Sequence, residues 1–372
     1  MPFINKENSV YITGGTGFVG YWLAKRLIEK GYYVRCLVRK SSNVDKLRAL
    51  GAELVEGVLN YPQSLELGIQ NAKYVFHLAG LTRALNYHEF LKVNQDGCRS
   101  IAAACLETGK NFGFPPTLVS VSSLAGAGPG LLKRPDDPLL TDAEREDHYK
   151  YRGRRETDEP RPLSAYGRSK IAGEKELLKF ADQIPISIVR PPYIFGPGDP
   201  LSVPLFKMAA HSRFFPVPGY FSFRFSFIHV EDLVELLIRT AERGERLRSN
   251  SLDRSKETGT CSGKGIYFAA SPEAPFFSEF GMMLGRCFGR KDLHTVKCPP
   301  LGVFGTGLVQ EIWKRLTHKQ VGFDWNKAVE AIHGPWICSE KKICDAFHFS
   351  FPHSLQDRLQ QTADWYLKEK WI

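Results

Sequence analysis

The feature that most constrains the fold is a glycine-rich run between a predicted strand and a predicted helix. Residues 9–13 form an apolar run, and the sequence then reads GGTGFVG. An apolar helical face follows at Val19, Leu23 and Leu27. Glycines in such a turn let the backbone approach a pyrophosphate, and the helix N-terminus presents unpaired N–H groups to it. The pattern predicts a dinucleotide site whose phosphate contacts come from Gly14, Gly17, Phe18, Val19 and Gly20.

Short apolar runs alternate with amphipathic stretches over the first 190 residues, which is typical of βαβ units and a parallel sheet. Helices are predicted over residues 89–107 and after Ser164, a favourable N-cap residue. The predicted strands cover residues 9–13, 33–38, 53–56, 73–77, 117–122 and 186–190. The sequence therefore predicts an α/β fold, a Rossmann-type doubly wound parallel sheet with a smaller, irregular C-terminal subdomain.

The predicted domain organisation follows from where this alternation weakens. Residues 1–190 plus about 225–243 are assigned to the dinucleotide-binding domain, with residues 225–230 and 232–242 as one more strand and helix of the main sheet. Residues 191–224 plus about 266–372 are assigned to a substrate-binding subdomain. The polar segment 244–265 is predicted to be a mobile insertion. The charged segment 133–162 is interpreted as a solvated loop, with a substrate lid as the alternative.

The end of the second predicted strand indicates which dinucleotide binds. An NAD site expects an acidic residue there for the ribose 2′-hydroxyl, but this chain has Arg39 and Lys40. A guanidinium at this position pairs with a 2′-phosphate and stacks near the adenine. The sequence therefore favours NADP (NADPH) as cofactor, with NAD as the alternative.

Charge and cysteine usage narrow the class of partner. Lys plus Arg exceed Asp plus Glu by ten, without a nucleic-acid-binding motif, so the excess is assigned to an anionic cofactor and a solvated surface. The eight cysteines are scattered, which predicts free thiols and no metal site. The sequence has neither a transmembrane run nor a secretory signal, so we expect a cytoplasmic location and a small-molecule substrate.

Tyr166 and Lys170 form the predicted catalytic pair. A spacing of four puts them on one helical face, where the ammonium stabilises the phenolate and makes the tyrosine a usable acid and base. The predicted strand before residue 122 ends in the hydroxyls of Ser122 and Ser123. Ligands bind at this carboxyl edge of open α/β sheets, so these side chains are expected near the reacting groups.

With these motifs, the chain resembles an extended short-chain dehydrogenase/reductase of the NAD-dependent epimerase/dehydratase superfamily. Its pattern is nearest to members of the dihydroflavonol reductase and 3β-hydroxysteroid dehydrogenase type. The similarity also covers VFHLAG at 75–80, VNQDG at 93–97, VRPPYIFGPGD at 189–199 and FSFIHVEDL at 225–233. It implies Tyr166 as general acid/base, Lys170 as its partner and ribose ligand, Ser123 bound to the reacting oxygen, and Asn94 in support.

The resemblance assigns further roles by position. Cofactor contacts are implied for Leu59, Leu78, Ala79, Gly80 and, near the nicotinamide, Pro191. Substrate contacts are expected from Ser122, Thr82, Tyr193 and Arg224. Relatives carry an Asp for the adenine after the third strand, whereas this chain has Val58, so that contact is not predicted. The resemblance also implies a homodimer through the helices over residues 89–107 and 164–181.

The reaction expected from these residues is the interconversion of a secondary alcohol and a ketone. Dehydratases have an Asp-Glu pair after the catalytic hydroxyl position, where this chain has Leu124 and Ala125. The aromatic runs at 204–206, 214–215 and 220–223 suit a hydrophobic substrate if they line the pocket. An NAD-dependent nucleotide-sugar epimerase is the alternative enzyme, although Arg224 stands one position away from the phosphate-binding arginine of that group. A non-catalytic dinucleotide-binding module is the lesser alternative.

Overall fold

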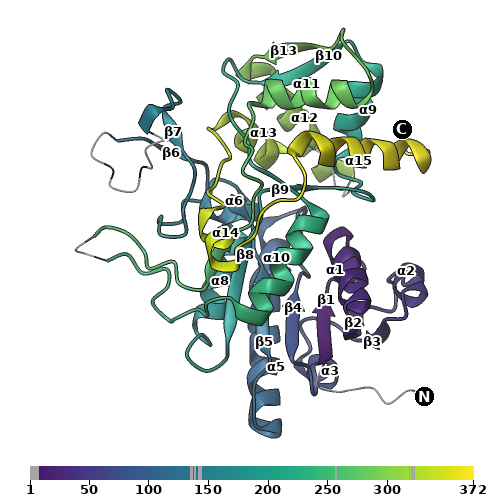
Figure 1. The fold of residues 1–372 in the computed structure, drawn as a ribbon, viewed down its shortest axis with the longest axis vertical. Coiled ribbons are helices and arrows are strands. Elements are labelled where there is room, and N and C mark those ends of the chain that lie inside the picture. Colours follow the sequence, from purple (N-terminus) through teal and green to yellow (C-terminus); the bar gives the residue numbers. More distant parts are fainter. Residues whose placement is uncertain are drawn as a thin grey trace.

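The computed structural model describes residues 8–134, 137, 140, 145–255, 258–317, 319 and 323–372. A seven-stranded parallel sheet forms its centre, with the strand order β12-β8-β5-β4-β1-β2-β3 (Figure 1). The strands are β1 (Ser9–Thr13), β2 (Tyr33–Val38), β3 (Glu53–Glu56), β4 (Tyr74–His77), β5 (Thr117–Val121), β8 (Ile186–Arg190) and β12 (Ile266–Phe268). The predicted doubly wound α/β fold is therefore confirmed.

Helices cover both faces of the sheet because its strands are apolar on both sides. Val10 and Ile12 of β1 pack in the core under one set of helices, while Tyr11 packs in the core under the other. The first set is α1 (Phe18–Glu29), α2 (Asp45–Ala49), α10 (Val230–Arg243) and α14 (Lys341–Phe347). The second set is α3 (Pro62–Ile69), α5 (Asp96–Phe112) and α8 (Ala165–Leu178).

Two predictions about the sheet are wrong. The strand predicted at 225–230 is β11 (Phe227–His229), and it pairs with β9 (Tyr193–Phe195) in a separate two-stranded sheet. The edge strand of the main sheet is instead β12, which was assigned to the other domain and pairs with β8. Both segments are short and apolar, so sequence periodicity does not reveal which neighbour each one pairs with.

The helix predicted over residues 89–107 consists of three parts. It begins as α4 (Tyr87–Phe90), passes through one π-helical turn, η2 (Leu91–Gln95), and continues as α5. A π-helical turn inserts an extra residue and re-aims the side chains that follow, and such turns are frequent at functional sites. Asn94 lies in this turn.

The remaining elements gather at one end of the sheet (Figure 1). A third core, built on phenylalanines from α9, β10, β11 and α11, joins them to the C-terminal helix. These elements are α9 (Val203–His211), β10 (Phe214–Pro218), α11 (Phe277–Cys287), β13 (His294–Cys298), α12 (Pro300–Thr317), α13 (Trp325–Ile332) and α15 (Leu355–Lys368). Apart from β12, which lies in the main sheet, the assignment of residues 191–224 and about 266–372 to a substrate subdomain stays a prediction.

Two polar segments make buried contacts with the rest of the protein. In segment 244–265, Leu247 and Ser251 are fully buried and the Leu247 N–H donates to the Ile186 carbonyl at 2.7 Å; that this segment is mobile stays a prediction. Segment 133–162 contains β7 (Tyr151–Arg152), which pairs with β6 (Leu131–Leu132) just before the segment, and Arg152 forms a buried ion pair with Asp158 at 2.8 Å. Residues 135–136, 138–139, 141–144 and 256–257 of these segments lie outside the described part of the chain.

The cysteines are free thiols, as predicted, and six of the eight are buried. In the part of the chain that the structure describes, no helix has the length and apolar character needed to cross a bilayer.

Candidate functional site

The glycine-rich turn forms a cradle that only glycine permits. Gly14 has φ +79°, and a Cβ atom placed there would lie 2.6 Å from the amide nitrogen of Ala79. A Cβ on Gly20 would lie 2.1 Å from the Gly14 carbonyl oxygen, to which the Gly17 N–H donates at 3.0 Å. Any side chain at these positions would fill the space or push α1 away from β1. The cradle therefore fits the diphosphate of a dinucleotide at the N-terminus of α1.

The predicted 2′-phosphate residues lie at the end of β2, beside this cradle. The Arg39 and Lys40 side chains are exposed; Lys40 forms a loose ion pair with Glu56 at 3.7 Å. No hydrogen bond or ion pair connects the Arg39 guanidinium to another described residue. Arg39 is therefore available to an anionic ligand.

The other predicted residues on this side of the site are packed against helices. Phe18 and Val19 form the first turn of α1 and are partly buried in the core. The Leu59 side chain packs on Gly97, where a Cβ would lie 2.4 Å from the Leu59 Cδ2. Val58 is half exposed, and its N–H and carbonyl both bind the Ser64 hydroxyl. Position 58 therefore offers no carboxylate to an adenine.

The carboxyl ends of β1 and β4 are tied together by a buried hydrogen bond. Thr13 Oγ1 lies 2.7 Å from His77 Nδ1, and the Leu78 N–H donates to the Thr13 carbonyl. Burial and the nearby Lys170 ammonium lower the pKa of His77 to about 3. His77 is therefore neutral at physiological pH and positions Leu78 and Ala79 next to Gly14.

We expect this neutral histidine to make stability depend on pH. Since the pKa is about 3 in the folded chain and about 6.5 in the unfolded chain, the unfolded state binds the extra proton between these values. The contribution of His77 to the free energy of unfolding is fully present well above pH 6.5. Below that value it falls by about 1.4 kcal/mol per pH unit. Urea denaturation between pH 7 and pH 5 measures the free energy of unfolding at each pH. Its slope against pH should be smaller in His77→Gln than in the wild type by about that amount. Equal slopes for both proteins would contradict this reasoning.

Asn94 holds the loop after β4 against α8. Its Nδ2 donates to the Leu81 carbonyl at 3.0 Å and to Ser169 Oγ at 2.9 Å, and its Oδ1 accepts from the Leu81 N–H at 2.8 Å. A Cβ on Gly80 would lie 3.1 Å from Asn94 Oδ1 and 3.6 Å from Lys170 Nζ. All of the polar groups of this side chain are hydrogen-bonded within the protein. Its effect on the site therefore comes from holding Gly80 and α8 in position.

Tyr166 and Lys170 are held on the first turns of α8. The Ser164 hydroxyl caps this helix by accepting the Gly167 N–H at 3.0 Å, as the sequence predicted. Lys170 Nζ donates to the Val121 carbonyl at the end of β5, at 2.8 Å. Within the described chain, the Tyr166 hydroxyl forms no hydrogen bond, and the residue is partly exposed. Its phenol is thus free to meet a ligand.

Ser123 lies where β5 meets α8. It is the N-cap of α6 (Leu124–Ala127), and its oxygen accepts the Ala125 N–H at 3.1 Å while its own proton stays available. A Cβ on Gly167 would lie 2.3 Å from the Ala125 carbonyl oxygen, which shows how closely α6 approaches the Tyr166 end of α8. The Leu124 N–H donates to the carbonyl of the buried Pro191, so the end of β8 borders the same place.

Ser122, the second candidate hydroxyl, is turned away from this place. It donates at 2.5 Å to Glu174, which pairs with Arg190 through contacts of 2.9 and 2.5 Å. Both charged side chains are almost completely buried. The sequence reasoning missed this network because its members are separated by 16 to 52 positions along the chain. The Ser122 hydroxyl is thus directed to Glu174, and its contact with the substrate stays a prediction.

A pocket lies beside Tyr166, between the loop after β4 and the C-terminal region. Asn326 accepts the Ala165 N–H at 3.1 Å, and the Lys327 ammonium lies 5.7 Å from the centroid of the Tyr166 ring. The lining residues are Thr82, Arg83, Phe90, Tyr166, Asp324, Asn326, Lys327 and Glu330. Thr82, for which a substrate contact is predicted, is among these lining residues. The wall from α13 and its N-cap residue was missed, because Asp324 indicates a helix start but not its partner.

The other two expected substrate residues are bound elsewhere. The Tyr193 hydroxyl is hydrogen-bonded to Ser202 at 3.1 Å. The Arg224 guanidinium pairs with Asp147 at 2.7 Å and stacks over the rings of Tyr149 and Phe276. This pair ties the charged segment 133–162 to the segment after β10. Neither side chain is among the residues that line the pocket at Tyr166.

Comparison with known proteins agrees with this arrangement. Residues 10–251 match the NAD dependent epimerase/dehydratase family. The chain is 30% identical to a protein named ceramide reductase from Caulobacter vibrioides, over 98% of this chain and 96% of that protein. It is 28% identical over 236 residues to 4-hydroxy-2-methyl-3-oxo-4-farnesyl-3,4-dihydroquinoline-1-oxide ketoreductase from Stigmatella aurantiaca, covering 63% of this chain and 64% of that one.

The fold is also found in solved structures. A UDP-glucose 4-epimerase from Thermotoga maritima superimposes with a TM-score of 0.69 over 97% of this chain and 99% of its own, at 18% identity. The protein belongs to the NAD-dependent epimerase/dehydratase family and is an NAD(P)-dependent enzyme of the extended short-chain dehydrogenase/reductase type.

Proposed function

We propose that the protein is an NADP-dependent oxidoreductase that interconverts a ketone and a secondary alcohol on a hydrophobic substrate. The observation that carries this proposal is the free phenol of Tyr166 on α8, one turn from Lys170 and at the end of α8 that α6, with its N-cap Ser123, approaches. A general acid, a neighbouring cation and a hydrogen-bond donor are what carbonyl reduction requires around the reacting oxygen.

The chain's own residues divide the work as follows. The cofactor supplies the hydride in reduction and accepts it in oxidation. The Ser123 hydroxyl donates a hydrogen bond to the carbonyl oxygen and holds it in place. Tyr166 gives its phenolic proton to that oxygen as negative charge develops there, and takes the proton back in the oxidative direction. The Lys170 ammonium, fixed by the Val121 carbonyl, stabilises the phenolate that remains.

The proposed NADP preference rests on Arg39, and it can be tested by substitution. A guanidinium–phosphate contact contributes about 1.5–3 kcal/mol, so Arg39→Asp should weaken NADPH binding about 10- to 100-fold while NADH binding stays the same or improves. Fluorescence titration with both nucleotides measures this effect. The control is Arg48→Asp, an exposed arginine on α2 that pairs with Asp45. Equal losses in the two variants, or tight retention of NAD in the purified protein, would contradict the NADP assignment.

The hydrophobic substrate is supported by two relatives. One relative is named ceramide reductase, and the other is named as a ketoreductase of a farnesyl-bearing quinoline. Both names refer to substrates with long apolar groups. We propose a lipid ketone as the substrate class. Phe90 lies beside Tyr166 in the lining of the small pocket, together with the polar side chains of Arg83, Asn326 and Lys327.

We also propose a homodimer through α5 and α8, and a cytoplasmic location stays a prediction. The buried Glu176 of α8 joins the two helices, since it pairs with Arg99 of α5 at 3.2 Å and with Lys179, just after α8, at 2.9 Å. Light scattering of the purified protein measures the oligomeric state directly.

A further inference from the structure

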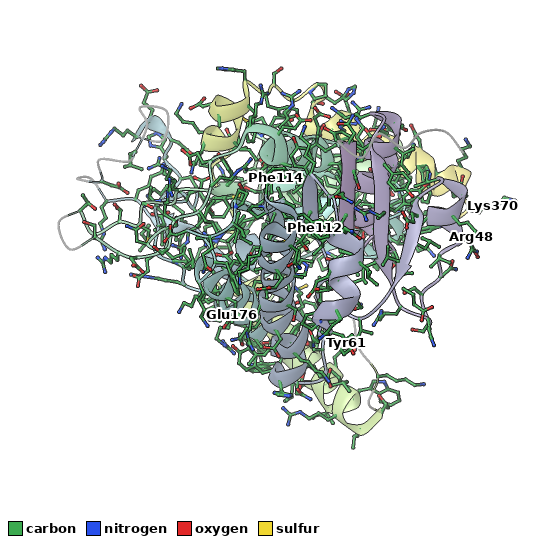
Figure 2. All side chains as sticks on the ribbon, turned by 90° about the horizontal axis from the view of Figure 1, so that it is seen from below. Arg48, Tyr61, Phe112, Phe114, Glu176 and Lys370 are labelled. Atoms are coloured by element: carbon green, nitrogen blue, oxygen red, sulfur yellow. The ribbon has the colours of Figure 1, made fainter. Side chains whose placement is uncertain are left out.

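An unusually apolar exposed face lies on α12, the longest helix of the region beyond the sheet. Six large apolar side chains of this helix are between 49% and 84% exposed. They are Leu301, Leu308, Val309, Ile312, Trp313 and Leu316. Positions 301, 308, 312 and 316 follow one another at spacings of seven and four residues, and 309 and 313 lie beside them, so the six form one stripe along the helix. Figure 2 shows α12, in yellow-green, projecting at the lower edge of the molecule.

The opposite face of α12 is firmly packed on α13. A Cβ on Gly307 would lie 2.7 Å from the Cβ of Ala328, and the rings of Phe304 and Trp325 are 5.2 Å apart. Val303 is buried on the same side. The helix is therefore fixed to the protein by one face, and the stripe on the other face is not an unfolded or unpacked segment.

The charges around the stripe suit a negatively charged surface. Glu311 is the single acidic residue of α12, and its carboxylate holds Lys314 at 2.6 Å and Arg315 at 3.2 Å. Lys297 and Lys319, before and after the helix, are exposed, as is most of Arg315. The chain as a whole carries a net charge of +10. An anionic surface facing the stripe would thus meet cations and no free carboxylate of this helix.

The stripe is connected to the site through α13. That helix packs on α12 and brings Asn326 and Lys327 to Tyr166. A surface that covers the stripe would therefore contact the helix on which the pocket wall packs. Apolar patches of this kind, bordered by polar residues, are typical of membrane and protein contacts.

We propose that α12 docks the enzyme on a lipid bilayer with anionic headgroups, with its apolar stripe inserted at the headgroup boundary. The choice of a lipid surface rests on the proposed function, since a lipid ketone resides in a bilayer. Trp313 and the leucines would enter the interface while Lys297, Arg315 and Lys319 contact the headgroups. The helix lies on the membrane and does not span it, because its other face is occupied by α13.

Vesicle sedimentation of the full-length protein tests this proposal. We expect binding to phosphatidylcholine vesicles that contain about 30% phosphatidylglycerol, and weaker binding without it. The double variant Ile312→Asp, Leu316→Asp should bind at least about tenfold more weakly. The matched control is Phe114→Asp, which alters a side chain that is 80% exposed and lies well apart from α12 in Figure 2. Bromine-labelled lipid should quench the wild type more than Trp313→Phe.

Several results would overturn the proposal. One is wild-type protein that stays in the supernatant with both kinds of vesicle, and another is a double variant that sediments as the wild type does. If the double variant instead converts a larger assembly into a smaller one in light scattering, without any vesicle binding by the wild type, the stripe is an interface between copies. NADPH-dependent reduction of a water-soluble ketone, measured without vesicles, tests the proposed function separately. The double variant should keep that activity.

Discussion

Tyr166→Phe should lower the rate of ketone reduction by about 10²- to 10⁴-fold, the usual contribution of a positioned general acid. The substitution removes only the hydroxyl, which forms no hydrogen bond within the described residues, and it keeps the ring that packs 6.0 Å from Phe90. NADPH affinity and the melting temperature should therefore change little. Steady-state kinetics together with a fluorescence titration separates the loss of chemistry from a loss of binding.

The control for this variant is Tyr87→Phe. Tyr87 lies on the neighbouring helix α4, is 40% exposed and stacks against Arg168, and it is not among the pocket residues. It should keep wild-type turnover. Full turnover by Tyr166→Phe would show that another group supplies the proton, and the assignment of the acid would then be wrong.

Arg190→Met should cause the largest loss of stability. The buried carboxylate of Glu174 would keep only the Ser122 hydroxyl as a partner, and breaking one side of a buried ion pair costs about 3–5 kcal/mol. The double variant Arg190→Met, Glu174→Gln removes the unpaired charge and should regain much of that loss. Urea denaturation at pH 7 measures the free energy of unfolding in each case.

An exposed ion pair provides the comparison for this prediction. Lys341→Met breaks the ion pair with Asp345, in which both side chains are about two-thirds exposed. This substitution should lower the free energy of unfolding by less than about 1 kcal/mol. A cost for Arg190→Met no greater than that of Lys341→Met would mean that the network contributes little. The network also holds the strand ends next to Ser123 and Pro191, so a large cost should be accompanied by reduced activity.

Much of the sheet could be predicted from the sequence because buried parallel strands are continuous apolar runs bounded by glycine or polar turns. The strands β1, β2, β3 and β8 have the predicted bounds. The pairing of β11 and β12 could not be predicted, since three-residue strands carry no information about their neighbours. The π-helical turn at Asn94 was also missed, because one extra residue in a helix barely changes the spacing of its apolar face.

The candidate site likewise has a part that could be predicted from the sequence and a part that could not. The glycine cradle and the pair Tyr166 and Lys170 are local patterns, and the structure brings Gly80 within reach of Lys170 as adjacent strand ends require. The wall from α13 depends on a contact between positions 161 residues apart, Asn326 and Ala165. Such a contact depends on how α13 packs on α12 and against α8, and no short motif encodes it.

Transfer of deuterium from labelled NADPH tests the central claim most directly. The purified protein is incubated with a long-chain ketone and NADPH deuterated on either face of the nicotinamide, and the product is analysed by mass spectrometry. The proposed function predicts an alcohol that carries deuterium on the carbinol carbon from one of the two labelled forms only. Absence of the labelled alcohol, with firmly bound NAD found in the purified protein, would contradict it and indicate an epimerase.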